Sequence, residues 1–111
     1  MAVTVKVLVP SKIAESSQTT QYTASSVTTI LDKFTATNYS ATAATLSVNL
    51  VTLAGTAGND NLITKTKTLQ PAEVYTFPEL VGQVLMAGGF ISTIAGTASA
   101  INIRASGREI S

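Results

Sequence analysis

The stretch ATLSVNLVTL, residues 44–53, decides the fold of this chain more clearly than any other. Leu46, Val48 and Leu50 fall on one side of an extended backbone, and the residues between them fall on the other side. Alternation with a period of two is typical of a β-strand that has one face toward a core. The stretch therefore predicts a strand in the middle of a sheet.

Similar stretches recur along the chain, separated by clusters of Gly, Pro, Asn and Ser. Further strands are predicted over residues 2–9, 18–24, 27–38, 62–69, 74–77, 90–94 and 100–105. A helix is also possible early in residues 27–38, although the threonines there favour a strand. We expect Pro10 to end the first strand or to place it at a sheet edge. We expect residues 96–99 to form a hairpin between the last two strands.

Seven to eight short strands in 111 residues predict an all-β chain with one small antiparallel β-sandwich, Ig-like or jelly-roll-like. The whole chain, residues 1–111, is expected to be a single domain, with residues 1–17 as a possible N-terminal edge strand or arm. Residues 79–87 place apolar side chains at helical spacing, so a short helix or a turn is predicted there, and at most one short helix in the chain.

The composition argues against catalysis, because the chain has no His, no Cys and no Trp. The acidic residues do not adjoin in the sequence: Glu15, Asp32, Asp60, Glu73, Glu79 and Glu109. Acid–base catalysis needs positioned carboxylates or a carboxylate beside a base, so we expect no enzyme and no cofactor. One carboxylate in the loop at residues 59–61 is too few for a calcium site, so no metal is expected and an Asx-type turn is the better interpretation.

Charged residues make up 12% of the chain, and the net charge is +1. The basic residues are scattered, so we expect no nucleic-acid partner. Residues 80–103 carry no charge and are long enough to span a bilayer, but glycines and polar residues interrupt them, so no membrane span is expected. The low charge leaves two interpretations open: a surface that meets protein, or a soluble threonine-rich sheet.

Interface candidates are found near the two ends of the chain. The first strand is a candidate for strand addition to a partner's sheet. The charges at the end of the chain could dock a neighbour through salt bridges, or could be a solvated strand end. The candidate residues are Val3, Val5, Val7, Lys12, Arg104, Arg108 and Glu109.

Several segments between residues 33 and 110 carry a family resemblance: KFTATN (33–38), ATLSVNL (44–50), LQPAEVY (69–75), ELVG (79–82), AGGFI (87–91) and INIRASGREI (101–110). In these segments the chain resembles small virion accessory proteins of tailed bacteriophages and prophages. The resemblance implies a compact β-sandwich that decorates or cements the capsid, or else sits at the neck or tail. It implies, as partners, the major capsid protein or neck and tail proteins of the same virion, assembled in the bacterial host cytoplasm. Symmetric copies are expected, since virion parts occupy symmetric positions.

A carbohydrate-binding sandwich, such as part of a host-binding fibre, is the alternative from a different class. Sugar sites present aromatic faces beside polar groups, and Tyr22, Tyr39 and Tyr75 are the residues that could supply them. These tyrosines are dispersed along the chain and there is no Trp, which makes this alternative the weaker one.

Overall fold

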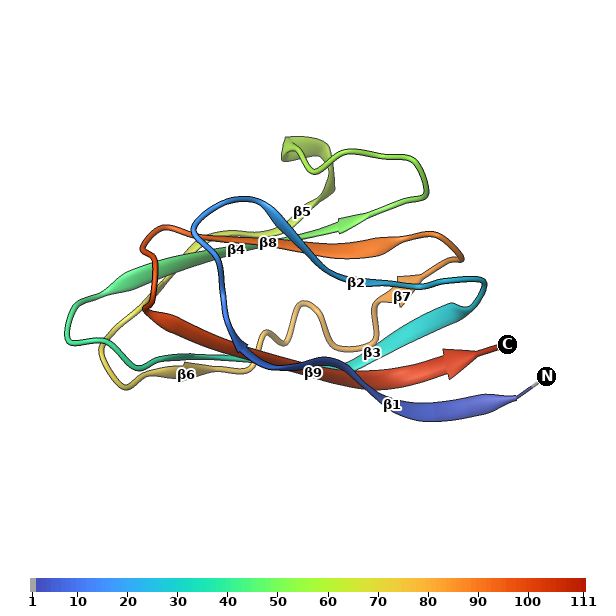
Figure 1. Cartoon of the computed structure of the whole chain (residues 1–111), viewed down its shortest axis with the longest axis horizontal. Helices are drawn as coiled ribbons and strands as arrows, with labels where there is room; N and C mark the ends of the chain where they lie inside the picture. The colour runs from blue at the N-terminus through green and yellow to red at the C-terminus, as the bar shows by residue number, and fades with distance from the viewer. Residues whose placement is uncertain (1) are drawn as a thin grey trace.

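The computed structural model describes residues 2–111, which form nine β-strands and one short 3-10 turn (Figure 1). The strands are β1 (Val3–Ile13), β2 (Thr19–Thr23), β3 (Thr28–Asn38), β4 (Ala44–Val51), β5 (Leu62–Leu69), β6 (Val74–Tyr75), β7 (Val84–Leu85), β8 (Phe90–Ala95) and β9 (Ile101–Ile110). The 3-10 turn, η1, spans Asn59–Asn61. The prediction of an all-β sandwich is confirmed.

Two antiparallel sheets make up the sandwich. One has the order β1-β9-β3-β6, with β7 also paired to β3, and the other has the order β2-β8-β4-β5. Without the two-residue β7, both sheets have four strands, and their orders run in step: β1 with β2, β9 with β8, β3 with β4, and β6 with β5. The two strands of each pair are consecutive in the chain and belong to opposite sheets. This is the arrangement of a jelly roll.

The core lies between the two sheets, where their apolar faces meet. Fully buried side chains come from both sheets and from the segment between β6 and β7. They are Val9, Leu31, Phe34, Leu46, Val48, Leu69, Phe77, Leu80, Ile91, Ile101 and Ile103. The Phe77 ring meets Phe34 edge-on at 5.0 Å between centroids. Burial of each large side chain contributes about 1.5–3 kcal/mol, so this layer is the main source of stability.

Strand β1 differs from its prediction in length but not in place. Pro10 does not end it, since β1 continues to Ile13, and β1 is an edge strand as expected. An edge tolerates proline because half of its backbone N–H groups need no ladder partner. The register shifts between Val7 and Val9, and Val9 is buried in the core. Strict alternation would have placed Val9 on the same face as the exposed Val5 and Val7.

A second bulge lies at the same level on the other side of β9. The register of β3 shifts between Leu31 and Lys33, and here Leu31 is fully buried while Ile30 is only half-buried. Between the two bulges lies Gly107 of β9. A Cβ atom there would meet the carbonyl oxygen of Ile30 and lie 2.9 Å from Cδ1 of Leu8, so the strands approach closely only because this residue is glycine.

Of the short helix or turn expected over residues 79–87, the turn is what the structure has, and the segment contains no helix. The segment forms successive tight turns, in which the N–H of Leu80 donates to the carbonyl of Phe77 at 2.9 Å. Gly82 has a φ of +85°, outside the helical region, and its N–H donates to the carbonyl of Leu31 at 2.7 Å. The backbone therefore bonds to β3 instead of continuing a helix, while Phe77 and Leu80 are buried in the core.

The hairpin predicted at residues 96–99 is also wrong. These residues connect β8 in one sheet to β9 in the other, so the two strands do not pair. The N–H of Gly96 donates to the carbonyl of Thr45 at 2.9 Å, which holds the crossing against β4. Strand β9 continues to Ile110, five residues beyond the predicted end, and it pairs with β1 and β3 along its length.

Candidate interaction surfaces

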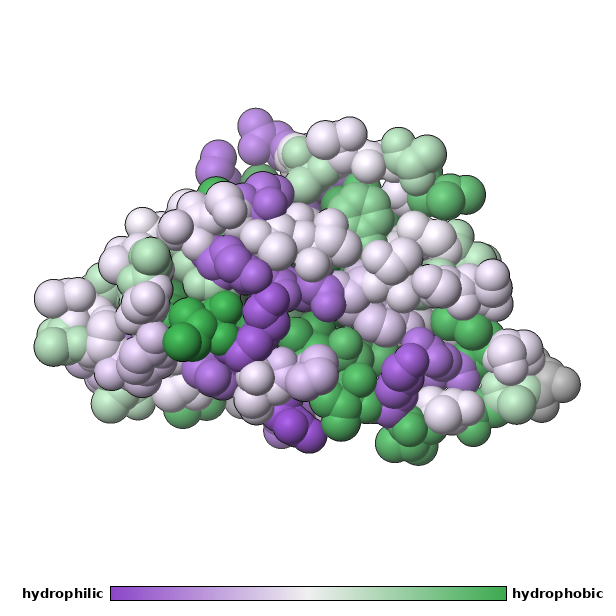
Figure 2. Space-filling view, in the orientation of Figure 1, coloured by the Kyte–Doolittle hydropathy of each residue, from purple (hydrophilic) through white to green (hydrophobic). Residues whose placement is uncertain are grey.

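The outward face of β1 carries a row of exposed valines. Val3, Val5 and Val7 are 57%, 82% and 41% exposed. They pair in register with alternate residues of β9, so the row lies on the outer face of the sheet. Figure 2 shows apolar surface along the lower rim of the molecule, where Figure 1 places β1. The rim therefore combines exposed β-branched side chains with an edge strand, which is where a further strand can pair.

The backbone of β1 also presents hydrogen-bonding groups on its open side. Ala2 and Ser111 exchange both of their backbone hydrogen bonds, at 3.1 and 3.0 Å. Because bonding direction alternates along an antiparallel strand, Thr4 and Lys6 direct their N–H and C=O groups toward β9. The same groups of the three valines point the other way, where none of the strands in residues 2–111 pairs with them.

Glu109 lies on the inner side of this end of the sandwich. Its side chain is 16% exposed, accepts a hydrogen bond from the Tyr22 hydroxyl, and forms a salt bridge with Lys6 Nζ at 3.3 Å. The Tyr22 hydroxyl lies 2.7 Å from the hydroxyl of Thr29. The bond from Tyr22, helped by Lys6, lowers the pKa of Glu109, and burial together with Glu109 raises the pKa of Tyr22 to about 12. Glu109 thus ties three strands together, a role that the sequence did not predict.

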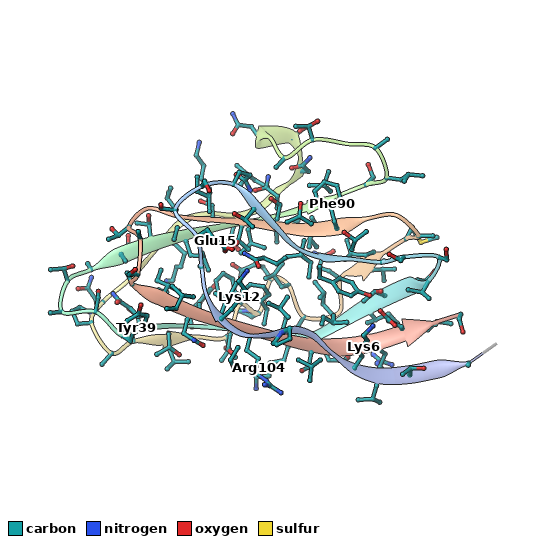
Figure 3. All side chains as sticks on the ribbon, in the orientation of Figure 1. Lys6, Lys12, Glu15, Tyr39, Phe90 and Arg104 are labelled. Carbon is teal, nitrogen blue, oxygen red and sulfur yellow. The ribbon has the colours of Figure 1, made fainter. Side chains whose placement is uncertain are left out.

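The two arginines of β9 point out from the sheet but have different surroundings. Arg108 binds Asp32 through two nitrogens, Nε at 3.1 Å and Nη2 at 2.9 Å, and these bonds raise the pKa of Arg108. Arg104 takes part in none of the salt bridges found within residues 2–111, and it borders a shallow hollow beside Lys33 and Thr35. Figure 3 shows Arg104 projecting away from the sandwich. Of the two, Arg104 is the one whose charge remains available to a partner.

Lys12 lies on the open side between the two sheets. Its Nζ is 2.8 Å from a carboxylate oxygen of Glu15, and Figure 3 shows the two side chains next to each other. The amide of Gln21 donates to Glu15 at 2.9 Å and to the Thr93 hydroxyl at 3.0 Å. The bonds from Lys12 and Gln21 lower the pKa of Glu15. Lys12 therefore links β1 to the segment that crosses to β2.

A carboxylate clasp closes the opposite side of the sandwich, and no pattern in the sequence predicted it. Glu79 accepts hydrogen bonds from the hydroxyls of Thr64 in β5 and Tyr75 in β6, the second at 2.8 Å. Lys67 Nζ lies 4.6 Å from the centre of the Tyr75 ring. Burial raises the pKa of Glu79, but the bond from Thr64, a backbone hydrogen bond, the bond from Tyr75 and the charge of Lys67 together leave the pKa lowered. We refer to Glu79, Thr64 and Tyr75 as the Glu79 clasp.

The loop expected to form an Asx-type turn is held against the outer face of β4. The amide of Asn49 donates to the carbonyl of Gly58 at 3.0 Å and to Asn61 Oδ1 at 2.7 Å. Asn61 also caps η1 by accepting from the N–H of Gly58 at 3.0 Å. In residues 2–111, no three acidic side chains come together in a group that could hold a metal ion.

The tyrosines named for a sugar site are not gathered into one surface. Tyr22 is buried, and Tyr75 packs edge-on against Phe77 at 4.6 Å with Lys67 over its ring. Tyr39 is half exposed, at the end of the sandwich away from the chain termini (Figure 3). An aromatic platform for a sugar therefore rests on Tyr39 alone.

Comparisons with known proteins do not indicate a function for this chain. No family model, curated protein or solved structure matches this chain. None of the helical segments within residues 2–111 is long and apolar enough to cross a membrane. What the arrangement provides is an open valine-bearing sheet edge beside an available cation, which suits binding to protein.

Proposed function

We propose that this chain is a non-enzymatic structural protein of a bacteriophage virion. Its role is that of a capsid decoration or cement protein, which stabilises the head through contacts with neighbouring capsid subunits. The proposal starts from the resemblance expected from segments between residues 33 and 110, and the jelly-roll order of the strands is compatible with it. Jelly rolls occur in viral capsid proteins, and also in lectins and cupins, so the fold agrees with the proposal without deciding it.

The observation that carries the proposal is the open edge of β1. Residues 3–7 offer unpaired backbone groups and three exposed valines on one strand. Strand addition at such an edge derives its affinity from main-chain hydrogen bonds and its specificity from alternate side chains. A structural protein of a particle works through contacts of this kind, made either with capsid subunits or with further copies of itself, because it acts by adding contact area between neighbours.

The ionisable groups support a structural role. Glu15, Glu79 and Glu109 each accept hydrogen bonds from two other side chains within the sandwich. These hydrogen bonds lower the pKa of each carboxylate, as expected of groups that hold strands together in the ionised form. A general acid needs the opposite shift, toward a raised pKa.

The copy number of the chain in purified particles tests the proposal. Quantitative mass spectrometry would compare the chain with the major capsid protein, in particles of the phage or induced prophage that encodes it. A number comparable with the capsid protein supports decoration or cement. A small, ring-sized number replaces it with a neck, collar or tail role, and absence from particles overturns the virion proposal.

A glycan array separates the carbohydrate-binding alternative from the virion role. Tyr39 is the exposed tyrosine, so binding to a defined glycan that is lost in Tyr39→Ala would favour the sugar-binding alternative. Equal signals from both proteins, at the level of a blank surface, would leave protein contact as the function to pursue.

A further inference from the structure

We propose that β1 pairs with β1 of a second copy of this chain in an antiparallel arrangement. The two-fold axis that relates the two strands passes midway between the two copies of Val5. The pairing would join the two β1-β9-β3-β6 sheets edge to edge into one continuous sheet. This inference rests on the proposed function for its setting in an assembly of many copies, and it deepens that function by identifying the partner of β1.

The first argument is the direction of the backbone groups. Val3, Val5 and Val7 point their N–H and C=O groups away from β9, as the bonds between Ala2 and Ser111 require. With the axis at Val5, Val3 lies opposite Val7 of the second copy, and the two copies of Val5 lie opposite each other. All three pairs are then hydrogen-bonded pairs that exchange two bonds each, or about six bonds in total.

The second argument is the match of side chains in this register. Opposed residues of an antiparallel pair lie on the same face, so each exposed valine meets a valine. On the other face, Lys6 lies opposite Thr4 of the second copy. Shifting the axis to Lys6 would place the two copies of that lysine directly opposite, and shifting it to Thr4 would leave Val7 without a valine partner. The register centred on Val5 is the one that pairs all three valines.

The third argument is what limits the pairing to residues 3–7. The bulge after Val7 turns the following residues into the core, and Pro10 supplies no N–H. Within residues 3–7, Lys6 is the one charged residue, and its Nζ lies 3.3 Å from Glu109. A lysine on an edge usually repels a second strand, but this one has a carboxylate partner.

The pairing is short, which suits an assembly. About six hydrogen bonds and three valine pairs give a weak interaction between two free copies, well below the area of a standard stable interface. Copies held next to each other on a particle meet at a high effective concentration, which converts a weak contact into a stable one.

Single cysteines test the register directly, because the chain has no cysteine of its own. Val5→Cys places two thiols on opposed residues whose Cα atoms lie about 5.5 Å apart, within disulfide range. Mild oxidation of concentrated purified protein is expected to convert most of Val5→Cys into a covalent dimer. Val3→Cys and Val7→Cys should each remain mostly monomeric alone, and should form a mixed dimer when combined.

Val74→Cys is the matched control, since Val74 is 56% exposed on the opposite edge of the same sheet. The proposal is overturned if Val5→Cys forms no more dimer than Val74→Cys, or if Val3→Cys and Val7→Cys each dimerise alone as well as Val5→Cys does. The measurement uses the isolated chain, so its failure leaves the copy number in particles unaffected. Absence from particles, in turn, would leave a cross-linked β1 pair standing.

Discussion

The two edges of the β1-β9-β3-β6 sheet are built differently. At one edge, β6 is two residues long, is followed closely by Pro78, and is held to β5 by the Glu79 clasp. At the other edge, β1 is eleven residues long and exposes Val3, Val5 and Val7. Short length, proline and covering contacts are the usual means of protecting an edge from other strands. In this sheet they are found at β6, while the first five residues of β1 lack them.

The contrast shows where a partner strand can add. A closed edge serves stability, because its polar groups are satisfied within the fold. An open edge leaves its groups to water until another strand arrives, and so it is available for association. Substitutions can disturb the attachment of the open edge, the closed edge and the surface of the open edge separately.

Gly107→Ala should have the largest effect. The added methyl group would meet the carbonyl oxygen of Ile30, a backbone atom that cannot move without shifting β3. We expect a loss of about 1–3 kcal/mol in the free energy of unfolding, measured by urea titration. Ser106→Ala, at the neighbouring position of β9, serves as the control and should change stability by less. Equal effects of the two substitutions would mean that the close approach at Gly107 does not matter.

Glu79→Ala tests the closed edge. It would leave the hydroxyls of Thr64 and Tyr75 without their acceptor, at a cost of about 1–2 kcal/mol in the free energy of unfolding. Asp60→Ala, at an exposed carboxylate, is the control and should lie within about 0.5 kcal/mol of the parent. Thermal unfolding of both variants measures the difference. A loss no larger than that of the control would contradict the clasp.

Glu109→Gln tests the anchor behind the open edge through its pH dependence. The bond from Tyr22 lowers the pKa of Glu109, so its stabilisation is present above the unfolded pKa of about 4.3 and is lost as the pH falls through the folded value. The variant should be less stable than the parent at pH 7, and the difference should shrink at pH 3. Urea midpoints at the two values measure it, and a gap that stays constant with pH would rule out this linkage.

Val5→Lys should have the smallest effect on folding and the clearest effect on association. The side chain is 82% exposed, so the free energy of unfolding should change by less than about 0.5 kcal/mol. The two-fold pairing would place two lysines directly opposite each other, and association should be lost. Sedimentation velocity over a concentration series, with Val74→Lys as control, measures this. Unchanged association in Val5→Lys would place the contact elsewhere.

Much of the sandwich follows from local alternation. Strand β5 spans the predicted residues 62–69, and β2 lies within the predicted residues 18–24. The bulges near Leu8 and Asp32 could not be predicted, because one inserted residue moves all following side chains to the other face and leaves no mark in composition. The turn at residues 96–99 could be located, but its neighbours give no sign of which sheet each strand joins.

The candidate surface was predictable only in part. The edge position of β1 was one of the two outcomes that Pro10 allowed, and the structure shows it. The roles of Glu109 and Glu79 did not, because Glu109 and Tyr22 lie 87 positions apart in the chain and Glu79 lies 15 from Thr64. Such contacts depend on which strands the fold brings together, and no short sequence motif predicts them.

Amide hydrogen exchange along β1 tests the central claim most directly. In dilute protein, the N–H groups of Val3, Val5 and Val7 should exchange much faster than those of Thr4 and Lys6, which bond to β9. In concentrated protein, the three valines should become protected while Thr4 and Lys6 change little. Equal exchange of the two sets at low concentration, or valines that stay unprotected at every concentration, would contradict an open edge that pairs with a second copy.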